Sequence, residues 1–492
     1  MQDHRFETLE SRIHLSAGSG AADLTHVTAQ LALPRIALSG ASAGGTSFFA
    51  GGRFVRLTAG GGPEFVFFDT IDAFSSANQQ PATTKLSQAR FGIAAAGTGG
   101  KVIFAGGSAM KVESRVVDIV DVASGQTSTH RLSRSRTFGV AVGIGNTIIV
   151  AGGTAKPDRT VDIWNTASNR WSTARMPHAL SNLTDGLGVP DIGAAVAGSK
   201  LIFTDGKIAE LYDTLTGRWT TAVMPNPTTR PVGTSIGGLA IFVGQDGLVN
   251  IYNDVTGAWT TQTAPQKLYG LAATSVGTKA IFAGGSNIVI QGSSAVSVFD
   301  SFSGQWSQTS LSVGRDYLAG TSSSGRAIFA GGMEHIGGNS VNAVDIFTDN
   351  TPIPVLSGGL SGNMGHRARV TVFNTGDADL TNTYSVNLYA STDRTLTGSV
   401  LVGSRGVIST LATGSSATFN IRTIKPKDLP AGKYHLLAAI ADSAGNLTPI
   451  TAEDSTFRVT GSSQVAVPAI SRTPMRFNWA FTRASHVVEQ WI

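Results

Sequence analysis

Short apolar runs that end in a glycine doublet, or in a remnant of one, recur seven times in the first 350 residues. The runs are Phe48–Gly52, Ile103–Gly107, Ile149–Gly153, Ile202–Gly206, Ile241–Gln245, Ile281–Gly285 and Ile328–Gly332. Successive runs lie about 39 to 55 residues apart. Apolar runs this short, bounded by turn residues, are typical of strands rather than helices. The spacing therefore predicts seven copies of one small unit built from strands.

Each copy has the same order of segments. A strand of small residues precedes the run, as in residues 139–143, and the run itself is apolar on both faces. A third strand alternates, as in Val117–Asp121, which places its apolar side chains on one face. A turn and a strand beginning with tryptophan follow, as in Asp213–Trp219, Asn253–Trp259, Asp300–Trp306 and, with Asn169 at the glycine position, Asn165–Trp171. We expect Trp219, Trp259 and Trp306 to be equivalent and largely buried.

Four short strands in a repeat of about 40 to 50 residues are typical of a β-propeller blade. The glycine doublet, the aromatic strand after it and the spaced tryptophan resemble kelch repeats across residues 24–350. That resemblance implies four antiparallel strands per blade around a central channel. We therefore predict an all-β chain with a seven-bladed kelch-type β-propeller at residues 24–350.

The two ends of this region predict how the propeller closes. The last repeat supplies three strands up to Asp349 and lacks its tryptophan strand. Residues 24–33 resemble an outer strand, since they parallel Trp171–Pro177. We expect this N-terminal strand to complete the blade that contains Gly331, which removes free sheet edges.

A different pattern begins after Pro352 and Pro354, with longer alternating strands and turns between them. Some 100 residues of this kind predict a β-sandwich. The elements Val372–Gly376, Leu388–Asp393, Leu411–Gly414 and Leu429–Tyr434 resemble, in order and spacing, the CARDB group of bacterial immunoglobulin-like domains. The resemblance implies an extracellular adhesion or spacer module at residues 351–460, followed by a flexible or loosely docked tail at 461–492.

The N-terminal segment, residues 1–23, includes Arg5–Ala17, which resembles a segment found near the N-terminus of many surface and secreted proteins of planctomycete bacteria. The resemblance implies export or a cell-surface location; the alternative is an ordinary disordered terminus. An apolar signal region and a membrane span are both absent from the sequence pattern. With a net charge of +5 over 492 residues, the chain is not expected to bind nucleic acid.

Candidate chemistry is sparse. The chain has no cysteine, which excludes disulfides, thiol nucleophiles and the cysteine–tyrosine cross-link of galactose oxidase-like copper enzymes. Its nine histidines include no pair at metal-ligand spacing on one element. We therefore predict no catalytic residues, no metal and no cofactor.

Five arginines recur at one place, between an outer strand and the next inner strand: Arg35, Arg90, Arg136, Arg230 and Arg315. Symmetry would place them around one mouth of the channel, where guanidinium groups suit carboxylates or acidic sugars. In the alternative interpretation, each arginine bonds backbone carbonyls and aspartates between blades.

Together these features predict a secreted or cell-surface bacterial binding or adhesion protein with a protein or polysaccharide ligand. The five arginines favour an anionic ligand. The alternative is a carbohydrate-active enzyme, a lyase or a sugar isomerase, with its site at the mouth of the channel.

Overall fold

The computed structural model describes residues 24–349, with gaps at 58–62, 76–79, 110–111, 155, 181–190, 215, 237, 255–256, 268, 287–290, 302 and 335–338. It also describes 356–361, 367–374, 384–392, 399–408, 411–412, 415–423, 429–441, 447–450 and 456–459. All regular structure in these ranges is β-strand, and every ladder is antiparallel. The predicted segments 1–23 and 461–492 lie outside the described residues.

Seven four-stranded sheets account for most of the described residues up to Asp349. Sheets 1 to 3 are β2 (Ser39–Ala43), β3 (Thr46–Ala50), β6 (Thr70–Phe74) and β7 (Ala82–Lys85); β8 (Ala94–Thr98), β9 (Lys101–Ala105), β12 (Val116–Asp121) and β13 (Thr127–Arg131); and β14 (Val140–Ile144), β15 (Thr147–Ala151), β16 (Thr160–Asn165) and β17 (Arg170–Arg175). Sheets 4 and 5 are β18 (Gly193–Ala197), β19 (Lys200–Thr204), β20 (Ile208–Asp213) and β21 (Arg218–Val223); and β22 (Val232–Ile236), β23 (Leu239–Val243), β24 (Leu248–Asn253) and β25 (Ala258–Thr263). Sheet 6 is β26 (Ala272–Val276), β27 (Lys279–Ala283), β28 (Ala295–Asp300) and β29 (Trp306–Ser310), and sheet 7 is β30 (Ala319–Ser323), β31 (Arg326–Ala330), β32 (Ala343–Asp349) and β1 (Leu24–Gln30).

Sheet 7 takes its fourth strand from the N-terminal end of the described chain. Strand β1 pairs with β32 over its whole length, from Leu24 opposite Asp349 to Gln30 opposite Ala343. The predicted pairing of this segment with the sheet that contains β31 is therefore confirmed. The edge of β32 is covered by a strand some 300 residues away in sequence.

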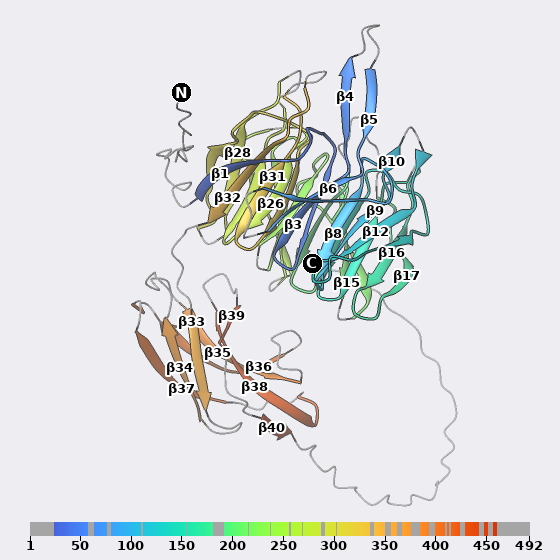
Figure 1. The fold of residues 1–492 in the computed structure, drawn as a ribbon. Helices are drawn as coiled ribbons and strands as arrows, with labels where there is room; N and C mark the ends of the chain where they lie inside the picture. Colours follow the sequence, from blue (N-terminus) through green and yellow to red (C-terminus); the bar gives the residue numbers. More distant parts are fainter. Residues whose placement is uncertain are drawn as a thin grey trace, which may run out of the picture.

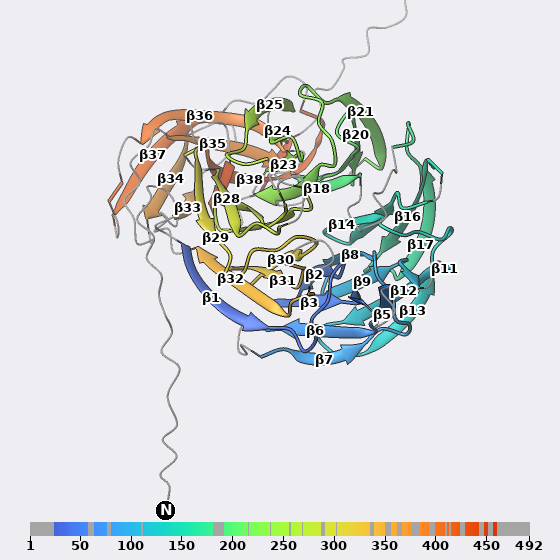
Figure 2. The same cartoon turned by 90° about the horizontal axis from the view of Figure 1, so that it is seen from above.

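The first strands of the sheets lie side by side in one series. Strand β2 lies beside β8, and the series continues through β14, β18, β22, β26 and β30, which lies beside β2 again (Figure 2). Small residues are required here because the backbones approach closely. A Cβ atom on Gly97 would lie 2.0 Å from the carbonyl oxygen of Ser42, and one on Gly233 would lie 2.4 Å from that of Ala194.

The hydrophobic core lies between the sheets. Each neighbouring pair of sheets shares one apolar cluster, to which the second strands contribute from both of their faces. Val102, Ile103, Phe104 and Ala105 of β9, for example, are all fully buried. The prediction that these runs are apolar on both faces because both faces are covered is confirmed.

The tryptophans that open the fourth strands are equivalent, as predicted. Trp219 lies opposite Tyr212, Trp259 opposite Tyr252 and Trp306 opposite Phe299. Their ring centroids are 5.0, 5.1 and 5.3 Å from those partners. Each ring is mostly buried and packs against the apolar cluster that its sheet shares with a neighbour.

Two faces of the series are distinguished by the chain path. On the entry face each first strand begins and each second strand ends; on the turn face a two-residue turn joins the first strand to the second. Two extra hairpins follow glycine doublets on the entry face: β4 (Arg53–Leu57) with β5 (Pro63–Phe67), and β10 (Ser108–Ala109) with β11 (Val112–Glu113). Figure 1 shows β4 and β5 projecting beyond sheet 1.

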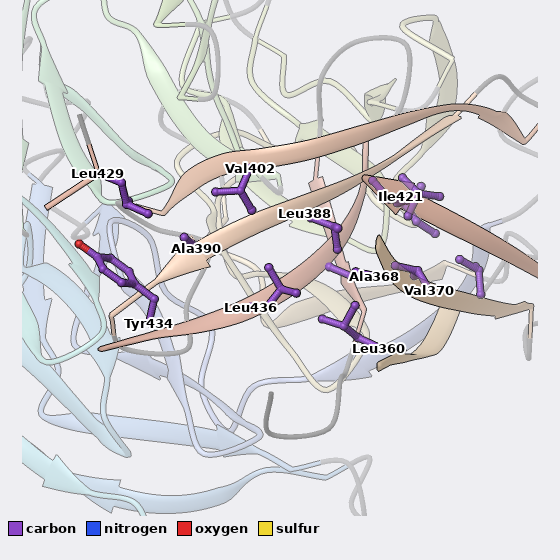
Figure 3. Close-up of a cluster of buried hydrophobic side chains, with 14 of the residues drawn as sticks. Leu360, Ala368, Val370, Leu388, Ala390, Val402, Ile421, Leu429, Tyr434 and Leu436 are labelled. Carbon is purple, nitrogen blue, oxygen red and sulfur yellow. The ribbon is translucent and has the colours of Figure 1, made fainter. Parts of the chain in front are cut away.

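The described residues after 355 form two further antiparallel sheets. One consists of β33 (Leu356–Ser361), β34 (Arg367–Asn374) and β37 (Ser416–Arg422), and the other of β35 (Tyr384–Ser391), β36 (Val400–Ile408), β38 (Gly432–Ala441), β39 (Leu447–Ile450) and β40 (Thr456–Val459). Side chains from both sheets, including Val370 and Ile421 of the first and Leu388 and Leu436 of the second, meet in one buried cluster (Figure 3).

Candidate functional site

Four of the five predicted arginines occupy equivalent buried positions, one in each of four sheets. This position is here called the arginine station. Arg35, Arg90, Arg136 and Arg315 are at most 1% exposed, and each follows a buried leucine by four residues. Each guanidinium pairs with an aspartate of the third strand in the sheet it enters. The pairs are Arg35–Asp72, Arg90–Asp118, Arg136–Asp162 (3.0 Å) and Arg315–Asp345 (2.6 Å).

The aspartate at each station also fixes the backbone of the incoming chain. Its Oδ1 accepts the N–H of the residue three positions before the arginine: Ala32 at 3.1 Å, Ser87 at 2.9 Å, Ser133 at 2.7 Å and Ser312 at 2.7 Å. The guanidinium donates to carbonyls as well, as Arg136 does to Gly152 (2.7 Å) and Thr160 (2.8 Å). Burial lowers the pKa of Arg35, Arg90 and Arg315, and the adjacent aspartate opposes that effect.

The glycine doublets explain why the arginine stations lie between sheets. The second glycine of a doublet donates its N–H to the carbonyl of the next sheet's arginine, as Gly107 does to Arg136 at 2.7 Å and Gly285 to Arg315 at 2.9 Å. A Cβ on the first glycine, Gly106, would lie 2.5 Å from that same Arg136 oxygen. The doublet and the arginine–aspartate pair are therefore two halves of one link between neighbouring sheets.

These contacts correct the expectation that all five arginines surround a ligand site. Four are buried and neutralised by aspartate, so their recurrence reflects joining of the sheets, as in the alternative interpretation. A buried charge needs such a partner, because desolvating it alone is costly.

Arg230 is different because it stands two residues beyond the arginine station. In sheets 4, 5 and 6 the residue after the buried Met or Ala is Pro177, Pro225 or Pro265, which has no N–H to donate. In sheet 5 the bond comes instead from Asn226, which donates its N–H to Asn250 at 3.0 Å. The station itself, four residues after Met224, holds the buried Thr228. Arg230 lies six residues after Met224, as Ala37 does after Leu31 and Tyr317 after Leu311.

Arg230 lies on the entry face and is partly exposed. Its Nε donates to Asp191 Oδ1 at 3.0 Å, and its guanidinium lies over the ring of Tyr269, 4.9 Å from the centroid. The side chains of Arg230 and Asp191 are 24% and 14% exposed. Of the five predicted arginines, this one alone is partly exposed.

A cavity of about 180 Å³ opens at the entry face, where the first strands begin. Its described lining comes from six of the seven sheets and includes Phe138, Tyr317 and Gly270. Beside it lies an apolar cluster that includes Phe91, Phe138 and Tyr317, with Phe67 and Tyr269 packed on its edge. Ring centroids are 5.6 Å apart for Phe91–Phe138 and 6.2 Å apart for Tyr269–Tyr317.

The backbone around this cavity has an unusual conformation. Ala37, Phe138, Arg230 and Tyr317 have φ between 47° and 57°, a left-handed conformation that is uncommon for residues with a side chain. Gly92 and Gly270 adopt it at equivalent places, at 62° and 71°. Such backbone strain is concentrated at functional sites in proteins.

The hairpin β4–β5 forms one rim of the entry face. Arg53, at its base, lies over Phe91 at 4.4 Å and Phe65 at 5.2 Å, and Phe67 stacks on Phe91 at 5.4 Å. Phe65 itself is 43% exposed.

Sequence reasoning did not identify Asp191, Tyr269, Tyr317 or Phe138 as site residues. A signal was present, since an aromatic residue stands just before the first strand in several repeats, at Phe91, Phe138, Tyr269 and Tyr317. Small residues dominate the inner strands, so the sequence pattern does not single out the side chains at their entrances.

Comparison with known proteins gives no family for this chain: no family model matches it, and no curated protein is significantly similar in sequence. The described residues contain no cluster of three or more histidine, aspartate or glutamate side chains placed to hold a metal ion. They also contain no helix long and apolar enough to cross a membrane.

Proposed function

We propose that this protein is a secreted or cell-surface binding protein in which the seven sheets are blades of a kelch-type β-propeller. The two later sheets are then an immunoglobulin-like sandwich of the CARDB type that serves as a spacer or adhesion module. Support for the first part comes from the closed series of first strands and from the shared fourth strand of sheet 7. Support for the second comes from the common core of the two sheets and from Tyr434, whose hydroxyl donates to the carbonyl of Pro430 at 3.0 Å, as in the tyrosine corner of such sandwiches.

The ligand site is the entry face, and the observation that carries this proposal is the Arg230–Asp191 pair beside Tyr269 and the cavity. Concave sites that combine aromatic surface with a few placed polar groups are typical of ligand binding. Here the aromatic rings offer apolar faces, Arg230 offers donors and Asp191 offers acceptors. This combination suits a polysaccharide, whose rings have apolar faces and whose hydroxyls both donate and accept.

The charge of the site favours a neutral ligand over an anionic one. Arg230 is paired with Asp191, and four of the five arginines that suggested an anionic ligand are buried on aspartates. Binding at this face is therefore expected to vary little between low and moderate salt, because screening weakens only uncompensated charge attraction.

The enzyme alternative, a lyase or sugar isomerase, calls for a cluster of histidine, tyrosine and glutamate at the mouth of the channel. The described lining of the entry cavity includes one tyrosine and neither histidine nor glutamate. That composition favours binding over catalysis.

An array of neutral and acidic polysaccharides probed with the full-length protein tests the proposal. Tyr269→Ala and Arg230→Ala should each weaken binding at least tenfold with little change in melting temperature. Arg170→Ala, at the exposed start of β17, is the matched control and should bind normally. Normal binding by both entry-face variants would exclude this site, and shortening of a bound polysaccharide would support the enzyme instead. Labelling of intact producing cells with a membrane-impermeant reagent tests the surface location.

A further inference from the structure

The turn face carries a second recurring charge, at the first residue of the second strand. Four sheets have a basic residue there: Lys101 in β9, Lys200 in β19, Lys279 in β27 and Arg326 in β31. Each lysine is paired with a carboxylate: Lys101 with Asp121, Lys200 with Asp254, and Lys279 with Asp300 at 3.2 Å. Lys279 also lies 4.0 Å from Asp349 of the next sheet.

The strand register shows what Arg326 lacks. In sheets 2, 4 and 6 the residue directly opposite the base on the third strand is an aspartate: Asp121, Asp213 and Asp300. In sheet 7 the residue opposite Arg326 is Thr348, which carries no charge. The basic position is thus retained in sheet 7 while the acidic one is replaced.

The guanidinium of Arg326 is left with unsatisfied hydrogen-bond donors. Its Nε and Nη2 are buried and have no hydrogen-bond partner in the described part of the chain. These two atoms form one edge of the guanidinium, the edge that binds both oxygens of a carboxylate at once. Two buried donors without acceptors are costly, so an acceptor supplied from outside would be bound favourably.

A cavity on the turn face adjoins Arg326. It has a volume of about 300 Å³ and is lined largely by small polar residues, among them Ser235, Ser275, Ser322 and Ser324. Serine hydroxyls are further donors and acceptors for a polar ligand. This cavity lies at the opposite ends of the first strands from the entry cavity, so the two sites are separate.

We propose that Arg326 is a binding site for the carboxylate group of an external ligand, which enters through the turn-face cavity. The ligand takes the place that an aspartate holds in sheets 2, 4 and 6. A carboxylate is favoured over a phosphate because the geometry that the repeat provides at this position is the one that accommodates an aspartate side chain. The site does not depend on the proposed polysaccharide binding at the entry face.

Thermal unfolding of the full-length protein with sodium acetate, sodium glucuronate or sodium phosphate, at constant ionic strength adjusted with sodium chloride, tests the proposal. Acetate and glucuronate should raise the melting temperature saturably, with the folded-to-unfolded ratio increasing about tenfold at ten times the Kd. Response to glucuronate alone would identify a sugar acid as the ligand. Response to phosphate alone, or to none of the three anions, would overturn the proposal.

Four variants locate the effect. Arg326→Met should abolish the response to carboxylates, whereas Lys101→Met, at the equivalent position of sheet 2, should keep it. Thr348→Asp restores the missing acidic residue, so it should raise the melting temperature without ligand and remove the response. A response that survives in both Arg326→Met and Thr348→Asp would place the carboxylate elsewhere. Tyr269→Ala should leave the response intact, which separates this test from that of the entry face.

Discussion

Gly332 donates its backbone N–H to the carbonyl oxygen of Arg35 at 3.0 Å, joining the last repeat to the segment that enters the first sheet. The guanidinium of the same arginine pairs with Asp72 inside sheet 1. Together with the β1–β32 ladder, this link holds sheet 7 against sheet 1 by contacts between the two ends of the described repeat region. Closure therefore uses the same doublet–arginine link that joins several sheets elsewhere.

Breaking a buried arginine–aspartate pair should destabilise the fold strongly. Arg136→Met leaves Asp162 buried without its cation, and removal of one partner of a buried pair costs about 3–5 kcal/mol. Urea denaturation measures the free energy of unfolding. Arg134→Met, two residues earlier, is the control: its side chain is 56% exposed, and exposed pairs contribute about 0–1 kcal/mol. Equal effects of the two substitutions would contradict a structural role for Arg136.

The first glycine of a doublet should tolerate no side chain. Gly106 has φ of 70°, and a Cβ there would lie 2.5 Å from the backbone oxygen of Arg136. Gly125 has nearly the same φ, 68°, but a Cβ there would meet no atom within 4 Å. Gly125→Ala should cost about 1–2 kcal/mol, the cost of a left-handed residue alone, and Gly106→Ala clearly more. If the two alanine variants unfold at the same urea concentration, close packing against Arg136 is not what requires glycine.

Removal of the N-terminal strand should open sheet 7. A chain that lacks residues 1–33 leaves the β32 edge unpaired, so we expect a lower melting temperature and association between molecules, measured by differential scanning fluorimetry and size-exclusion chromatography. A synthetic peptide of residues 24–33 should restore the melting temperature by refilling the edge. Unchanged stability of the shortened chain would show that the pairing contributes little.

Asp345 should contribute to loss of stability in acid. Burial is the largest influence and raises the pKa of this carboxyl, but the hydrogen bond from His26, the charge of Arg315 and the N–H of Ser312 outweigh it and hold the pKa below its ordinary value. A carboxyl of this kind stabilises the fold above its unfolded pKa, about 3.9, and that stabilisation is lost as the pH falls through the folded pKa.

Asp345→Asn should therefore be less stable than the unmodified protein at pH 6, and the difference should narrow below about pH 4. Urea denaturation at a series of pH values measures both curves. Asp69→Asn, which removes a carboxylate paired with the exposed Lys85, should change the unfolding free energy little at any pH. A difference for Asp345→Asn that stays constant from pH 6 to pH 2 would contradict the argument.

The strand order of the sheets follows from the sequence because each strand type has its own composition. Small residues mark the first strand, the Ile-Phe-Ala run the second, alternation the third and tryptophan the fourth. Even the pairing of β1 with β32 was predictable, since a missing strand at one end matched a surplus strand at the other.

The site was harder to predict because it depends on residues that are distant in sequence. Arg136 and Asp162 are 26 residues apart, and their pairing buries a side chain that the sequence pattern alone places in a surface loop. The aspartate in the middle of a buried strand, as in Val161–Asp162–Ile163, was the available signal, since a buried carboxylate requires a partner. Arg230 was misassigned because the station in sheet 5 holds Thr228, and an arginine two residues later resembles a station residue in the sequence.

The segment after each glycine doublet is the place where the chain can vary in length without disturbing the sheets. The hairpin β4–β5 and the shorter β10–β11 both enter between a second and a third strand, and both leave the four-stranded order of their sheets intact. Chain length at these positions is thus uncoupled from the links that join the sheets. Five other sheets offer the same junction, so foreign loops grafted there would surround the Arg230–Asp191 pair and alter selectivity while the framework stays the same.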